Sequence, residues 1–387
     1  LPMHLTGLMG MPRRVYTYLP DRGWDWPNLI STAGAFVFAA AVGLWIIDMI
    51  RNFRPFGGRD AGNVFDGPGL EWLPTGLYSV RSIPVITSRY PLWEQKDLAR
   101  DVEAGRYFLP NTATGERETI VTSTLNAEPQ YLQRMPDPSA WHVWAAVFTA
   151  GFFLLLTVKA YWPAAISGVL GVYCIVQWCW FLDRPRVQPT ADIGAGIVVP
   201  TYASGPSSHG WWAAVITLVV AGMVGTLMGF SYVFLWSRNP ELWSPPPGIG
   251  SMIGAVAAYV LAGVLAWASC RTLRLDRPRS AAVATLLMAV AAGLAAAGWW
   301  TDLQAWISTG LAASATTQGA TVFALLSWQG MFAALVAAMG LYAVGRWLAG
   351  HVEAARPATF QLIGLFIAFT AAQGLFATLL VRLFPGG

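Results

Sequence analysis

The sequence predicts an all-α fold, a polytopic transmembrane helical bundle with about eight full membrane-spanning helices. Composition is the first reason. Of the 387 residues, 55% are hydrophobic and only 11% are charged, which leaves too little polar surface for a soluble globule of this size. The second reason is a series of long apolar runs. Each is close to the roughly 20 residues that a helix needs to cross about 30 Å of hydrocarbon.

Eight apolar runs predict the helices in chain order. Residues 1–10 read as the end of a ninth helix, and the chain opens without Met and without a signal-peptide pattern. We therefore expect a fragment of a longer protein. The eight runs are 29–50, 142–162, 164–182, 211–236, 251–270, 281–300, 319–344 and 359–383.

Hydrophobicity collapses between the first and second runs. Residues 51–140 are rich in charge, Pro and Gly, and 96–103 is the only plausible short helix among them. This break predicts three parts. Residues 1–60 hold a helix end and one complete helix, 61–140 form a polar linker, and 141–387 form a helical membrane domain.

Arginine placement predicts the orientation. Counting helices, four arginine clusters fall on one side of the membrane, and the positive-inside rule makes that side cytoplasmic. The rule places residues 52–140 in the cytoplasm and the loops 237–250 and 301–318 outside. Arg13 and Arg14 are the exception, since this topology puts them on the outer side. The clusters are Arg51, Arg54 and Arg59; Arg184 and Arg186; Arg271, Arg274, Arg277 and Arg279; Arg346 and Arg356.

One N-terminal segment carries a long motif. Residues 4–18 read HLTGLMGMPRRVYTY, which closely resembles the HxxGLxGMPRR segment of haem-copper oxidase subunit I. The resemblance continues through NLIST at 28–32 and LEWLP at 70–74, so it covers residues 1 to about 90. It implies that residues 1–60 are the C-terminal end of oxidase subunit I, and that Arg13 and Arg14 hold the haem propionates.

The chemistry of arginine agrees with that role. Two anionic propionates at a membrane edge need fixed cations, and the planar guanidinium is a permanently charged fork for carboxylates. The alternative is a pair of arginines that snorkel to lipid headgroups. Tyr16, Tyr18 and Asp21 either join a hydrogen-bonded region above the propionates or belong to an ordinary interfacial aromatic belt.

The second half resembles oxidase subunit III more weakly. The segments that carry this resemblance are SHGWW at 208–212, YVFLW at 232–236 and ELWSPPPGI at 241–249. Residues 142–182 look like the linker region of bacterial fused I+III chains. Two departures stand out: Gly222 takes the place of a membrane glutamate of many subunit III sequences, and SWQGMF at 327–332 replaces a histidine-rich helix.

The residues for metal chemistry are few. Two haems and a copper need about six histidines, whereas this chain has four, all near predicted membrane edges, and no CxxxC or HxxxY pattern. Cys174, Cys179 and Cys270 read as small core residues. We therefore predict no catalytic residue and no metal ligand in this chain. The four histidines are His4, His142, His209 and His351.

The resemblance implies a cytochrome c oxidase of the bacterial inner membrane that reduces O2 and translocates protons. Haem and copper belong to the complete enzyme. The expected partners are an upstream metal-binding part of subunit I, a subunit II with the electron-entry copper, cytochrome c and membrane lipid. The net charge of +4 needs no nucleic acid. The alternative is a membrane transporter or a non-catalytic structural or assembly protein.

Other polar residues in the runs have structural interpretations. Asp48 lies three residues before Arg51, a spacing that predicts an interfacial ion pair. Lys159 is close enough to the outer face to snorkel. Uncharged amides inside the helices predict hydrogen bonds between helices rather than a transport path. These amides are Gln177, Gln329 and Gln373.

Overall fold

The computed structural model describes residues 2–52, 62–73, 82–110, 117–135, 139–182, 189–194 and 196–384. The chain divides into two compact units, Leu1–Thr75 and Gly76–Gly387. Several residues used for the orientation and the resemblance lie outside the described part. They are Arg54, Arg59, Pro74, Arg184 and Arg186.

The described residues of the first unit form the α-helices α1 (Pro2–Leu8) and α2 (Asp25–Asn52) and the single-turn helix η1 (Leu70–Trp72). The 28-residue α2 is apolar along its length, and none of its residues is buried within the unit. Asp25 lies in its first turn and Arg51 in its last, charges that complement the helix dipole. The helix covers the predicted run 29–50 and begins four residues before it.

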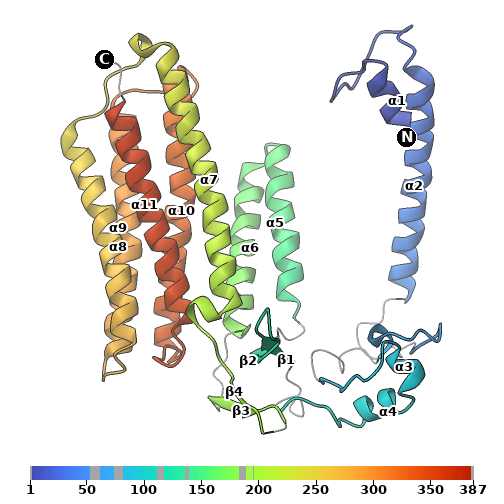
Figure 1. The fold of residues 1–387 in the computed structure, drawn as a ribbon. Coiled ribbons are helices and arrows are strands. Elements are labelled where there is room, and N and C mark those ends of the chain that lie inside the picture. The colour runs from blue at the N-terminus through green and yellow to red at the C-terminus, as the bar shows by residue number, and fades with distance from the viewer. Residues whose placement is uncertain are drawn as a thin grey trace. The chain divides into compact units, whose positions relative to one another are not determined.

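The described part of the second unit contains seven long helices, preceded by a short polar region. The hairpin α5 (Trp141–Thr157) and α6 (Tyr161–Leu182) precedes five helices that stand side by side in Figure 1. These are α7 (His209–Arg238), α8 (Ile249–Leu273), α9 (Ser280–Ser308), α10 (Thr317–Leu348) and α11 (Ala358–Leu383).

The helical membrane fold is confirmed, with corrections at the helix ends. Seven described helices are long and apolar enough to cross a membrane, and α5, with 17 residues, is shorter. The predicted run 142–162 is too long, because Lys159 adopts a left-handed φ of 60° and a new helix starts at Tyr161. The predicted loop 301–318 is also wrong in its first part, since α9 continues to Ser308.

Small residues bring α8, α9, α10 and α11 into close contact. Ala262, Ala291 and Ala295 are fully buried in this core. A Cβ on Gly340 of α10 would lie 2.7 Å from the Cβ of Ala292 in α9, so only glycine fits at this crossing. Helix packing in a bilayer depends on such van der Waals contact, because lipid is as apolar as the side chains.

The polar region contains more secondary structure than predicted. Beside the expected helix, now α4 (Leu98–Glu103), it holds the one-turn α3 (Pro91–Glu94) and a hairpin of β1 (Glu118–Thr122) and β2 (Pro129–Arg134). A second hairpin, β3 (Thr190–Asp192) and β4 (Val198–Pro200), contacts the first through β2 and β4. Two single-turn helices, η3 (Gly205–Ser207) and η4 (Pro240–Leu242), flank α7.

The two hairpins share a small apolar core and are tied to α7. Leu132 of β2 and Val199 of β4 are buried in this core. Tyr131 Oη lies 2.8 Å from Nδ1 of His209, the first residue of α7. Burial raises the pKa of the Tyr131 phenol above its ordinary value, so the phenol is neutral at physiological pH.

Candidate functional site

A tight turn carries the paired arginines away from α1. The amides of Met9, Gly10 and Met11 donate to carbonyls of Leu5, Gly7 and Thr6 at 2.9, 3.0 and 3.0 Å. Gly10 has a φ of +90°, a conformation that glycine adopts without steric cost and that commonly ends a helix. Helix α1 therefore ends at Leu8, four residues before the motif's Pro12.

Contacts with the start of α2 hold this turn in place. The indole Nε1 of Trp24 donates to the Met9 carbonyl at 3.2 Å, and Nδ2 of Asn28 lies 3.6 Å from the Met11 sulfur. The rings of Tyr18 and Trp24 meet edge to face, with centroids 5.6 Å apart. The arginine-bearing segment is thus fixed to the N-terminal end of a membrane-spanning helix.

Arg13 and Arg14 are both exposed, and neither forms an ion pair with a carboxylate in the described part of the chain. Arg14 has a φ of 61°, and a left-handed conformation costs a residue other than glycine roughly 1–2 kcal/mol. Two adjacent, exposed cations on an anchored turn suit a bidentate anion such as a carboxylate. The donor chemistry therefore fits haem propionates.

The neighbouring polar residues do not form a closed network with the arginines. Tyr16 is 97% exposed, and Asp21 is exposed with a φ of 67°. An open hollow of about 480 Å³ lies beside the turn, lined by Tyr18, Asp25 and residues of the first turns of α2. Among the described residues, no hydrogen bond joins Tyr16 or Asp21 to either arginine.

The four histidines lie on different segments of the chain. His4 is exposed in α1, and the other three lie in the second unit. The His142 ring is 5.8 Å from that of Trp178, and the His351 ring is 5.6 Å from that of Trp180. Within the described ranges, no group of three or more His, Cys, Asp or Glu side chains is placed to hold a metal ion.

Sequence reasoning missed a buried ion pair at one end of the bundle. Arg382 Nη2 of α11 lies 2.6 Å from Asp302 Oδ1 of α9, and both side chains are 2% exposed. Thr378 donates to the other carboxylate oxygen at 3.0 Å, and Arg382 Nη1 donates to the Pro247 carbonyl at 2.8 Å. The available signal was one acidic and one basic residue near the ends of two apolar runs, but 301–318 was assigned to a loop.

The predicted hydrogen bonding between helices is confirmed for two of the three glutamines. Gln373 Nε2 of α11 donates to Gln329 Oε1 of α10 at 3.1 Å, and Gln329 Nε2 donates to the Thr370 carbonyl at 2.9 Å. The predicted ion pair of Asp48 with Arg51 is wrong. The Asp48 carboxylate instead accepts from Asn52 Nδ2 at 2.7 Å, one helical turn away.

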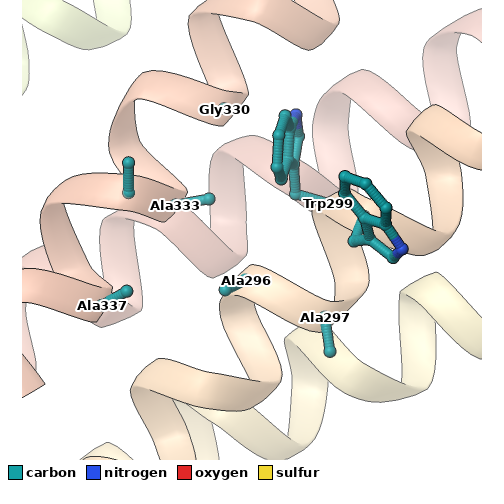
Figure 2. Close-up of a pocket in the computed structure, with 8 residues that line it drawn as sticks. Ala296, Ala297, Trp299, Gly330, Ala333 and Ala337 are labelled. Carbon is teal, nitrogen blue, oxygen red and sulfur yellow. The ribbon is translucent and has the colours of Figure 1, made fainter. Parts of the chain in front are cut away.

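The hollows of the helical domain are apolar. One of about 380 Å³ lies between α9 and α10, and Figure 2 shows alanines, Gly330 and Trp299 around it. Trp299 uses its Nε1 to donate to the Leu326 carbonyl at 2.8 Å. Another, of about 700 Å³, is lined by α6, α10 and α11, chiefly with aliphatic side chains. Neither presents an ionised group for catalysis.

Comparison with known proteins finds similarity to subunits of oxidases. No protein-family model matches the chain. Cytochrome c oxidase subunit 1 of Bacillus subtilis is 44% identical over 96 residues, which are 24% of this chain and 15% of that protein. The probable quinol oxidase subunit 1 of Staphylococcus aureus is 36% identical over 198 residues, which are 50% of this chain and 27% of that protein.

A third relative, cytochrome c oxidase subunit 1 of a Bacillus species, is 36% identical over 119 residues, 28% of this chain and 19% of that protein. The chain thus spans less than a third of the length of these curated relatives. Part of it is similar to subunit 1 of cytochrome c and quinol oxidases. The alignment with the quinol oxidase subunit covers half of the chain and is longer than the first unit, Leu1–Thr75. The similarity therefore extends into the second unit.

Proposed function

We propose that this chain is part of a haem-copper terminal oxidase that transfers electrons from cytochrome c to O2 and translocates protons. The observation that carries the proposal is the similarity to oxidase subunit 1. In this proposal haem and copper are bound in the complete enzyme. An upstream part of subunit I supplies the metal ligands, and a subunit II carries the electron-entry copper.

Arg13 and Arg14 have the role of holding haem propionates. Their support is the exposed, paired placement on a turn that Trp24 and Asn28 anchor to α2. A fixed positive charge near a haem opposes the loss of an electron, so it raises the midpoint potential. A unit charge acting over about 10 Å at an effective dielectric of about 20 contributes on the order of 1–2 kcal/mol, or tens of millivolts for one electron.

Redox titration of the purified complex tests this role. Arg13→Ala and Arg14→Ala should each lower the midpoint potential of the nearer haem by tens of millivolts, with haem content measured first. Arg14→Lys keeps the charge and loses the bidentate fork, so a smaller shift is expected. Arg22→Ala is the matched control, because Arg22 is exposed on the same connection. Unchanged potentials and turnover in both alanine variants would assign the pair to lipid headgroups.

The bundle α7–α11 has a supporting role as the subunit III-like part of a fused chain. Its interior consists of small apolar residues and hydrogen-bonded amides, which suits a packed support. We expect a complex without residues 142–387 to retain its haems and the electron transfer between them. Immediate and complete loss of that transfer, with haems still bound, would contradict this role.

The electron donor in this proposal is cytochrome c. Its support is the similarity to cytochrome c oxidase subunit 1 of Bacillus subtilis and of a second Bacillus species. The purified complex should oxidise reduced cytochrome c rapidly and a soluble quinol slowly. The reverse preference would make the enzyme a quinol oxidase. We further propose that the complex lies in a bacterial inner membrane with residues 52–140 in the cytoplasm.

A further inference from the structure

Two buried polar atoms lie beside Gly225 of α7. Trp328 Nε1 of α10 and Gln373 Oε1 of α11 have no hydrogen-bond partner within the described residues. A Cβ on Gly225 would lie 3.5 Å from Trp328 Nε1 and 3.7 Å from Gln373 Oε1. The indole N–H can only donate and the amide oxygen accepts, so the two unmet requirements are complementary.

The amide network fixes which atom of Gln373 faces this point. A backbone carbonyl only accepts, so the group of Gln329 next to the Thr370 carbonyl is its NH2, which donates at 2.9 Å. The Oε1 of Gln329 is then the acceptor that faces Gln373. The group of Gln373 next to it is therefore the NH2, which donates at 3.1 Å. The Oε1 of Gln373 is therefore the atom left facing Gly225, on a side chain that is only 9% exposed.

Polar groups inside a membrane-spanning bundle need partners, because hydrocarbon supplies none. We propose that one water molecule is bound between Trp328 and Gln373, in the space left by the missing side chain of Gly225. The water accepts from the indole N–H and donates to the amide oxygen. Buried waters satisfy protein groups in this way when they have at least two polar partners. The water joins α10 to α11 beside Gly225 of α7.

A structure of the full-length chain in its native complex, at a resolution that shows ordered water, tests the site directly. The expected result is a density peak within about 3.2 Å of both Trp328 Nε1 and Gln373 Oε1. If other buried waters are visible and this place has no peak, the proposal is wrong. It is also wrong if the indole donates directly to Gln373.

A pair of glycine variants tests the same site through stability. The Cβ of Gly225→Ala makes only ordinary van der Waals contacts, but it occupies the space of the water. Gly222→Ala, three residues earlier on α7, is the matched control. Its Cβ would touch only the Phe369 ring, at 3.5 Å. Both substitutions favour the helix equally. Gly225→Ala should therefore melt at least about 2 °C below Gly222→Ala.

Equal or higher melting temperature for Gly225→Ala than for Gly222→Ala would overturn the proposal. Repeating the comparison in a Trp328→Phe background separates the effect of a bound water from that of steric fit. Trp328→Phe removes the indole donor, so one of the two groups that the water satisfies is gone. In this background the difference between the two alanine variants should shrink by about half, as expected for coupled sites. An undiminished difference would mean that steric fit, rather than a bound water, distinguishes the two glycines.

Discussion

Replacing Arg382 by alanine removes the cation of the buried ion pair that joins α11 to α9. Asp302, whose side chain is 2% exposed in the intact bundle, would keep Thr378 as its one remaining hydrogen-bond donor among the contacts described above. Removing one partner of a buried pair typically costs about 3–5 kcal/mol, because a charge stays buried without compensation. For a helical domain this corresponds to a decrease of roughly 6–20 °C in melting temperature.

A double-mutant cycle separates the lost charge from the lost packing. Asp302→Leu with Arg382→Met removes both charges and keeps similar volumes, so the double variant should recover most of the stability lost by either single variant. The exposed pair of Asp97 with Arg100, 70% and 76% exposed, provides the contrast. Arg100→Ala should change the free energy of unfolding by less than about 1 kcal/mol.

Thermal unfolding of the purified complex, followed by intrinsic tryptophan fluorescence, measures all five variants. The reasoning fails if Arg382→Ala melts within about 2 °C of Arg100→Ala. It also fails if the double variant is less stable than both single variants, because burial of an unpaired charge would then not be the cause of the loss.

Three further predictions concern other parts of the chain. In a background without native cysteines, an impermeant thiol reagent applied to intact cells should leave Leu125→Cys unmodified and label Leu242→Cys, two positions that are 93% and 73% exposed; the opposite result would invert the topology. Burial raises the pKa of Tyr131 above 10.0, so its contribution to stability is complete below pH 10.0 and falls as the pH rises further; unfolding measured against pH should lose this dependence in Tyr131→Phe. Gln329→Leu leaves the Gln373 amide donor buried without its acceptor, and should cost about 1–3 kcal/mol in denaturant unfolding, whereas a neutral effect would exclude a stabilising role for this amide pair.

The fold class could be predicted from the sequence because it depends on the number of consecutive apolar residues in each run. A helix in lipid needs only enough consecutive apolar residues, and seven of the eight predicted runs became helices of spanning length. The paired arginines were found for a similar reason, since Arg13 and Arg14 belong to one continuous motif. The amides Gln329 and Gln373 stood out because polar side chains inside apolar runs need partners.

Helix ends were harder, because apolar residues continue across them. Helix α5 ends at Thr157, before the left-handed Lys159, whereas α9 passes the polar Asp302 and continues to Ser308. The predicted loop 301–318 includes Asp302. Its pairing with Arg382 in the folded bundle neutralises the charge, and the helix can then include it.

By itself, the sequence determined that the chain is a bundle of membrane-spanning helices with a polar segment after the first of them. Tertiary structure alone decided which helix faces meet. The small and aliphatic residues of α8 and α9 lie on every side of these helices. The sequence pattern therefore does not indicate which face of each helix is buried. The pairing of Asp302 with Arg382, and of Gln329 with Gln373, depends on the rotation of helices about their axes. That rotation is set by close packing between residues far apart in the chain.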